Sequence, residues 1–149
     1  MDVDGVLTDG GLYYAENGDE LKRFDVRDGQ GLVLLLEAGV LTAIVTRKQT
    51  TIVTRRARDL GVVEVHQNVA DKGAIVTELL ARHHLRREEV CYVGDDVGDL
   101  PAMRAIGLAV AVADAVLAVR RAAAYVTRAH AGHGAIREIC DLILSARPR

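Results

Sequence analysis

The sequence predicts an α/β fold, built as a doubly wound parallel sheet with helices on both faces. Two observations favour this class: short apolar runs alternate with longer stretches of helical period, and 149 residues suit one compact domain. The expected strands are Leu41–Val45, Val62–His66, Val90–Val93, Leu108–Val112 and Tyr125–Val126. The expected helices are Gly29–Ala38, Thr50–Leu60, Asp71–His84, Asp99–Ala105, Ala115–Ala122 and Gly134–Ala146. Because strand–helix–strand units form right-handed parallel crossovers, residues 1–149 should fold as a single domain, with the ligand site at the carboxyl ends of the strands.

One segment departs from this alternation. Leu12–Glu16 and Glu20–Phe24 flank Asn17-Gly18, which is a strong signal for a two-residue turn. We therefore expect a projecting β-hairpin over about residues 12–24.

The N-terminus is a second departure. Only Met1 precedes the acidic Asp2, whereas a strand usually needs about five residues. We expect that either the natural chain begins further upstream or this one is shortened.

Composition and charge disfavour several classes of protein. Aromatic residues make up 3% of the chain and Trp is absent, so the core has to be aliphatic. A net charge of −2 gives no support to nucleic-acid binding or a membrane-surface role, and no apolar run approaches the ~18 residues of a membrane span. Cys91 and Cys140 lie in apolar surroundings, and no signal peptide is visible. We expect reduced thiols and a cytoplasmic protein.

The chain opens on an acidic motif, Asp2-Val3-Asp4-Gly5. Side chains two residues apart on a strand point to the same side, so the turn that follows could draw Asp2 and Asp4 to one site. An acidic surface turn is the simpler interpretation of this motif taken alone.

A second acidic cluster, Gly94-Asp95-Asp96-Val97-Gly98-Asp99, directly follows the expected strand Val90–Val93. Converging carboxylates repel one another unless a cation lies among them, and Mg²⁺ prefers oxygen ligands. Capping of the next helix by Asp95 or Asp96 is the alternative, but capping accounts for one aspartate and not three.

Two further residues complete a possible phosphate site. Thr46 ends the strand Leu41–Val45, where its hydroxyl could bind a phosphoryl oxygen, although a turn role is common for such a residue. Lys72 stands in the first turn of a helix, where a cation opposes the helix dipole, and this hints at a role beyond solvation. Together these elements supply the charge neutralisation, positioning and nucleophile that phosphoryl transfer needs.

Taken in the order in which they occur along the chain, the motifs resemble those of the haloacid dehalogenase superfamily. Asp2–Val6 is similar to its first motif, Thr46 to its second, Lys72 to its third and Gly94–Asp99 to its fourth. More narrowly, the chain resembles the 3-deoxy-D-manno-octulosonate 8-phosphate phosphatase subfamily. The segments that carry this likeness are Asp2–Gly10, Phe24–Gly29, Gly94–Met103 and Gly132–Glu138.

The resemblance implies a phosphatase without a cap domain that acts on a small acidic sugar phosphate in lipopolysaccharide biosynthesis. It implies that Asp2 is the nucleophile, and that Asp4 protonates the leaving alcohol and then activates water. It also implies a homotetramer closed by the hairpin. The other implied roles are Mg²⁺ binding by Asp2, the Asp4 backbone carbonyl, Asp95 and Asp99, phosphate binding by Thr46 and Lys72, and substrate binding by Arg27, Asp28 and Lys48.

Departures from the subfamily pattern affect the expected substrate more than the chemistry. The second motif reads Thr46-Arg47-Lys48 in place of the usual Thr-Gly-Arg, and the tail has His133 where Arg is more typical. A nine-carbon keto-deoxy sugar phosphate is an alternative substrate. A weakly active domain, similar to those attached to some sugar-activating cytidylyltransferases, is an alternative class. A receiver domain fits poorly, because neither Thr46 nor His66 is an aspartate at its strand end.

Overall fold

The computed structural model covers the whole chain, and its structure is described for residues 1–147. Two groups of parallel strands form the sheet. One group pairs β3 (Ala43–Val45) with β4 (Glu64–His66). The other has the order β5 (Cys91–Gly94), β6 (Leu108–Ala111) and β7 (Tyr125–Val126).

The first residues of the chain join these two groups. The amino group of Met1 donates to the carbonyl of Ala43 at 3.0 Å, and the Met1 carbonyl accepts from the N–H of Val45 at 2.9 Å. On the other side, the N–H of Asp2 donates to the carbonyl of Val93 at 3.1 Å. Met1 and Asp2 therefore occupy the central strand position between β3 and β5, which confirms the doubly wound parallel sheet.

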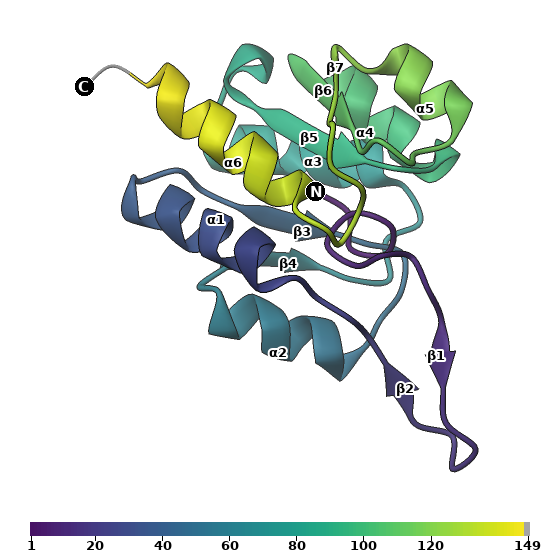
Figure 1. Ribbon diagram of the computed structural model, residues 1–149. Helices are drawn as coiled ribbons and strands as arrows, with labels where there is room; N and C mark the ends of the chain where they lie inside the picture. The colour runs from purple at the N-terminus through teal and green to yellow at the C-terminus, as the bar shows by residue number, and fades with distance from the viewer. Residues whose placement is uncertain (148–149) are drawn as a thin grey trace.

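Residues 1–147 form six α-helices that cover the sheet, and Figure 1 shows α1 and α6 in front of it with α3 and α4 behind. Their bounds are α1 Val26–Glu37, α2 Thr51–Asp59, α3 Lys72–Arg82, α4 Leu100–Ala105, α5 Leu117–Ala122 and α6 Ala135–Ala146. Two short 3-10 helices are η1 Arg87–Glu89 and η2 Val97–Asp99. The helices α1 and α6 pack on one another, as do α3 and α4. This places helices on both faces, as predicted.

The largest error in predicted boundaries is the start of α1. The helix begins at Val26, three residues before the expected Gly29, and Asp25 caps it by accepting from the N–H of Arg27 at 2.8 Å. Gly29 and Gly31 interrupt the apolar period of this segment, and both are buried in the helix packing. A Cβ on Gly31 would lie 3.0 Å from Cys140 of α6, so the small residue permits close approach of the two helices.

Strand and helix ends also differ from the prediction by a few residues. The strands expected to begin at Leu41 and Val62 begin at Ala43 and Glu64, and the helix expected at Ala115 begins at Leu117. Leu41 is exposed, which shows that apolar character alone does not fix where a strand starts.

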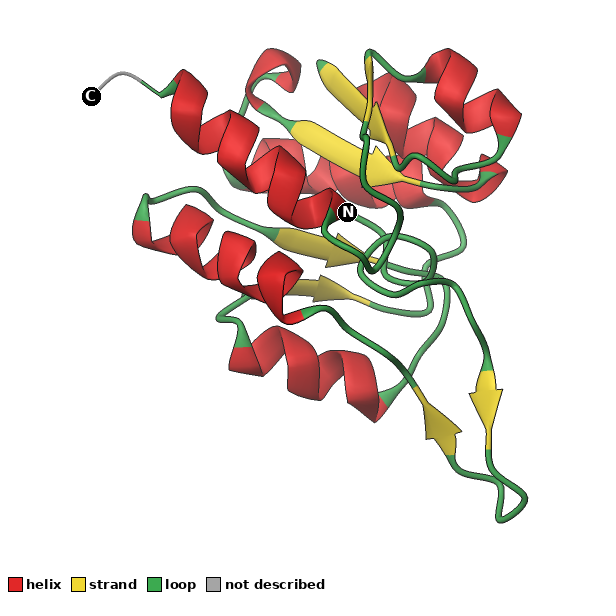
Figure 2. Ribbon diagram, in the orientation of Figure 1, coloured by secondary structure: helices red, strands yellow, loops and turns green. Residues whose placement is uncertain are grey.

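The predicted hairpin is present as β1 (Tyr13–Tyr14) and β2 (Glu20–Leu21), paired antiparallel, and it projects away from the sheet (Figure 2). Gly18 in its turn has φ +90°, a conformation that favours glycine. Within residues 1–147, this hairpin is the only regular structure between the first acidic motif and α1.

The core is aliphatic, as the composition predicts. Its most deeply buried large side chains include Val3, Leu32, Ile44 and Val110. Both cysteines are free thiols. Within residues 1–147 no helix combines the length and apolar character that a membrane crossing needs.

Candidate active site

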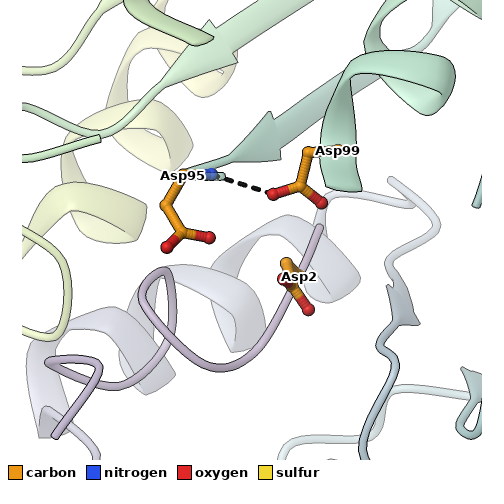
Figure 3. Close-up of side chains that lie close together, drawn as sticks. All are labelled: Asp2, Asp95 and Asp99. Atoms are coloured by element: carbon orange, nitrogen blue, oxygen red, sulfur yellow. Dashed lines mark hydrogen bonds between the residues drawn. The ribbon is translucent and has the colours of Figure 1, made fainter. Parts of the chain in front are cut away.

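Three aspartates from distant parts of the chain meet at the carboxyl edge of the sheet. Asp2 continues the central strand position, Asp95 follows β5 and Asp99 ends η2. One carboxylate oxygen from each lies within 4.8 Å of the others (Figure 3). The two acidic motifs therefore form one cluster, as the rule for ligand sites in parallel sheets predicts.

The turn after Asp2 is shaped to fit against this cluster. The N–H groups of Val6, Leu7 and Thr8 all donate to the carbonyl of Val3, which winds the chain tightly after the strand position. Gly5 adopts φ +81° in this turn, and a Cβ there would collide with the Asp95 carboxylate. Glycine is thus required both by the backbone conformation and by the close approach of the two motifs.

Asp99 holds the second acidic loop in place. Its Oδ2 accepts hydrogen bonds from the N–H groups of Asp95 at 2.9 Å and Asp96 at 3.3 Å. Its Oδ1 accepts from the Tyr92 hydroxyl at 2.8 Å and from Lys72 Nζ at 2.7 Å. Asp96 instead caps η2 by accepting from the N–H of Val97 at 2.6 Å, so capping accounts for this one aspartate.

Lys72 is a buried cation between two carboxylates. Its side chain is 3% exposed, and Nζ lies 2.6 Å from Asp2 Oδ2 and 2.7 Å from Asp99 Oδ1. Burial disfavours the charged ammonium, but the neighbouring Asp2 and Asp99 outweigh burial and raise the pKa of Lys72. The same cation, with the N–H of Asp95 and the Tyr92 hydroxyl, outweighs burial at Asp99 and lowers its pKa.

The cluster still carries more negative than positive charge. Burial, followed by repulsion from Asp2 and Asp99, raises the pKa of Asp95 to about 7. Burial and the Asp99 charge likewise raise the pKa of Asp2. Asp95 Oδ1 is buried and has no hydrogen-bond partner within residues 1–147. Three close carboxylates, one with an unpartnered oxygen, suit a hard divalent cation such as Mg²⁺.

Asp4 lies apart from this carboxylate cluster. Its side chain forms an ion pair with Lys22, which follows β2 at the base of the hairpin. The Lys22 side chain is 2% exposed, and its Nζ also lies 3.5 Å from Glu20 Oε1. The Asp4 carboxylate is thus held by a cation from the hairpin.

Thr46 is buried at the end of β3. Its N–H donates to the carbonyl of His66 at 2.9 Å, and its own carbonyl accepts from the N–H of Val69 at 3.1 Å. The preceding residue, Val45, binds the Met1 carbonyl, so Thr46 stands beside the strand position that ends in Asp2.

The three predicted substrate-binding residues have different surroundings. Arg27 is exposed and pairs with Asp25 at 3.0 Å. Lys48 pairs with Glu20 of the hairpin at 2.7 Å, which places a cation between the second motif and the hairpin. Both side chains are accessible to a ligand.

Asp28 requires a correction. It is 1% exposed, and its carboxylate accepts from the N–H of Gly134 at 3.3 Å and of Arg137 at 2.8 Å. These contacts tie α1 to the first turn of α6 and satisfy N–H groups that a helix start leaves free. The structure therefore gives Asp28 a structural role in place of the predicted substrate contact.

Two residues of the site were not predicted. Tyr92 lies within the expected strand Val90–Val93, whose apolar character gives no indication of a polar role. Lys22 lies on a hairpin, where a lysine is usually solvated. Local pattern offers no signal for either residue, because the partners Asp99 and Asp4 are set by tertiary structure.

Known proteins share this arrangement of fold and motifs. A family model described as haloacid dehalogenase-like hydrolase matches residues 40–139. The chain belongs to the haloacid dehalogenase-like hydrolase family. Within it, the chain is 45% identical to the 3-deoxy-D-manno-octulosonate 8-phosphate phosphatase of Yersinia pestis over 148 residues, which are 99% of this chain and 79% of that protein. It is 44% identical to the Escherichia coli K12 enzyme of the same name over 99% of this chain and 78% of that protein.

Solved structures agree with this assignment. The phosphatase of that name from Moraxella catarrhalis, in complex with magnesium ion, phosphate ion and KDO, has a TM-score of 0.96, with 38% identity over 99% of this chain and 84% of that one. The cobalt-bound enzyme from Haemophilus influenzae has a TM-score of 0.93 and 41% identity over 97% of this chain and 85% of that one. The family assignment replaces the receiver-domain alternative.

Proposed function

We propose that this chain is a Mg²⁺-dependent phosphatase that hydrolyses a small acidic sugar phosphate, with 3-deoxy-D-manno-octulosonate 8-phosphate as the expected substrate. The observation that carries the proposal is the convergence of Asp2, Asp95 and Asp99, with Lys72 bound to two of them. The relatives' substrate, named above, supports the identity of the sugar. Release of a free keto-deoxy sugar acid would suit lipopolysaccharide biosynthesis.

In the proposed reaction, an Asp2 oxygen attacks phosphorus while the ester bond to the sugar oxygen breaks. Asp4 gives its proton to the departing alcohol, and an aspartyl-phosphate remains on Asp2. Asp4 then takes a proton from water, which attacks the phosphorus and restores the Asp2 carboxylate. Lys22 pairs with the ionised Asp4 carboxylate, which is the form that takes the proton from water in the second step.

Asp2, Asp95 and the Asp4 backbone carbonyl would hold the metal, with Asp99 nearby. When bound, Mg²⁺ supplies charge that offsets repulsion between phosphate and carboxylates. Lys72 and Thr46 would bind phosphoryl oxygens, and Lys72 already fixes the nucleophile by its contact with Asp2 Oδ2. Lys72 thus links nucleophile and substrate phosphate.

The cationic side chains of Lys48 and Arg47 would bind the acidic group of the sugar. Lys48 lies on the motif loop that follows β3 and reaches Glu20 of the hairpin. Arg47 is exposed, and its guanidinium lies beside Gly98 of the second acidic loop. A nine-carbon keto-deoxy sugar phosphate carries the same kind of acid, so it is the second candidate substrate.

Metal removal tests the proposed chemistry. Chelator should abolish turnover of p-nitrophenyl phosphate and of eight-carbon and nine-carbon keto-deoxy sugar phosphates, and added Mg²⁺ should restore it. The physical reason is that close carboxylates repel a phosphate unless a cation screens them. Turnover that survives chelation contradicts the mechanism, and no turnover of any substrate with Mg²⁺ identifies a weakly active relative. Ranking kcat/KM across the panel identifies the sugar.

We also propose a homotetramer in which the hairpin forms subunit contacts. Leu12, Tyr14 and Leu21 are 59%, 68% and 62% exposed on this projecting element, which suits a contact surface. Replacing all three with Ser should yield monomers in light scattering at micromolar concentration, while the parent chain forms tetramers. A monomeric parent chain contradicts the proposal. A cytoplasmic location is part of the same proposal, since both cysteines are free.

A further inference from the structure

Four charged side chains form a continuous series from the first acidic motif to the base of the hairpin. Asp4 forms an ion pair with Lys22, and Nζ of Lys22 lies 3.5 Å from Oε1 of Glu20. The same Glu20 oxygen accepts a hydrogen bond from Nζ of Lys48 at 2.7 Å. The charges alternate in sign, and we call this series the ion-pair chain. It joins the residue proposed for proton transfer to a residue proposed to bind the sugar acid.

The two lysines of the ion-pair chain differ in exposure. The Lys22 side chain is buried, whereas that of Lys48 is 40% exposed and accessible to a ligand. A carboxylate on the ligand would therefore compete with Glu20 for Lys48, because an ammonium at the surface changes partners at a small free-energy cost. The buried ammonium of Lys22 cannot be solvated in the same way, so it depends on Asp4 and Glu20 for compensation of its charge.

Glu20 lies where it can bind either lysine. Its carboxylate is hydrogen-bonded to Lys48, while its separation from Lys22 is longer than a charged hydrogen bond. A shift of about 0.7 Å toward Lys22 would shorten that separation from 3.5 Å to about 2.8 Å, which is a normal length for such a bond. A closer Glu20 would draw the Lys22 ammonium away from Asp4, because the two carboxylates attract the same cation from different sides.

We propose that Glu20 is a positioning residue, which couples binding of the substrate's acid group at Lys48 to the freedom of Asp4 to reach the ester oxygen. When the acid group occupies Lys48, Glu20 moves onto Lys22, and the Asp4 carboxyl group can turn toward the leaving oxygen. When the sugar departs, Glu20 returns to Lys48 and Lys22 again binds Asp4. This inference rests on the proposed function, and it predicts that an acid group on the sugar raises kcat as well as lowering KM.

The first test observes Lys22 by NMR without any turnover. Because Lys22 is buried, its ammonium group should give a resolved signal in protein labelled at lysine nitrogen, and the loss of that signal in Lys22→Arg assigns it. Free 3-deoxy-D-manno-octulosonate carries the acid group but no phosphate. It should shift the Lys22 signal in the parent chain and not in Glu20→Gln. Asp19→Asn is the matched control and should respond as the parent chain does, because exposed Asp19 contacts only Asn17 in the hairpin turn through its side chain.

The second test separates kcat from KM for an acidic and a neutral substrate. The substrates are 3-deoxy-D-manno-octulosonate 8-phosphate and mannose 6-phosphate, whose sugar has no acid group. In the parent chain and in Asp19→Asn, kcat should be at least about tenfold higher for the acidic substrate. In Glu20→Gln the two kcat values should become similar, because Lys48 and Lys22 are no longer coupled. KM for the acidic substrate should also fall in Glu20→Gln, since no carboxylate of the chain competes for Lys48.

Three results would overturn the coupling: an unchanged Lys22 signal when the sugar acid is added to the parent chain, an equal shift in Glu20→Gln, or a kcat ratio that Glu20→Gln preserves. Each of them is compatible with a working phosphatase, because the parent chain would still hydrolyse phosphate esters. Absence of turnover by the parent chain in the presence of Mg²⁺ would instead contradict the proposed function. In that case the Lys22 signal still decides whether Glu20 couples Lys48 to Lys22.

Discussion

Replacing Asp2 with Asn should reduce phosphatase turnover by roughly 10³-fold or more, because an amide cannot act as the attacking nucleophile. The fold should survive this change. Burial, together with the Asp99 charge, raises the pKa of Asp2, so its ionised form is unfavourable in the folded state. Removing that charge relieves repulsion, while Lys72 keeps its contact with Asp99. We expect a melting temperature at neutral pH that is equal to or above that of the parent chain.

Asp96→Asn is the matched control for this experiment. Asp96 lies on the same acidic loop, but it is exposed and caps η2 through the N–H of Val97. Asn is also a favourable N-cap residue, so this variant should retain both stability and turnover. Full activity in Asp2→Asn, measured beside this control, would assign the nucleophile elsewhere.

The position of the acidic site could be predicted because it depends on topology. Asp95 follows an apolar strand, and Asp2 opens the chain at a strand position. Once the strands are parallel, their carboxyl ends must share one edge, and the two motifs meet there. The hairpin was also predictable, because Asn17-Gly18 encodes its turn locally.

The role of a polar side chain was harder to predict when its partner lies far along the chain. Asp28 binds backbone N–H groups that are 106 and 109 residues away, so its own segment carries no sign of a structural role. Tyr92 and Lys22 show the converse case. Their sequence neighbours suggest a core residue and a solvated residue, whereas each binds an aspartate of the active-site region.

Replacing Lys72 with Met should lower both stability and turnover. The change leaves Asp99, which is 0% exposed, and Asp2 without their shared cation. Removing one partner of a buried ion pair typically costs about 3–5 kcal/mol. Added Mg²⁺ should reverse part of the decrease in melting temperature, because a cation that binds only the folded state stabilises that state. Turnover should stay low even with Mg²⁺, since the proposed phosphate contact is lost.

The stability loss in Lys72→Met should depend on pH in a defined direction. In the parent chain Lys72 helps lower the pKa of Asp99, so ionised Asp99 stabilises the fold above the ordinary carboxyl pKa, and this contribution fades as pH falls. In Lys72→Met the buried, ionised Asp99 carboxylate has no cationic partner and destabilises the fold. Protonation of Asp99 removes that charge and so removes the destabilisation. The difference in melting temperature between parent and variant should therefore be large at neutral pH and smaller in acid.

Lys48→Met is the stability control for this comparison. Lys48 is 40% exposed and its pair with Glu20 lies near the surface, where an ion pair typically contributes at most about 1 kcal/mol. The decrease in melting temperature caused by Lys72→Met could be as small as that caused by Lys48→Met, or it could be independent of pH. Either result would show that Lys72 does not offset the charge of the buried carboxylates. The expected contrast follows from position alone, because both variants remove one ammonium and keep a similar side-chain stem.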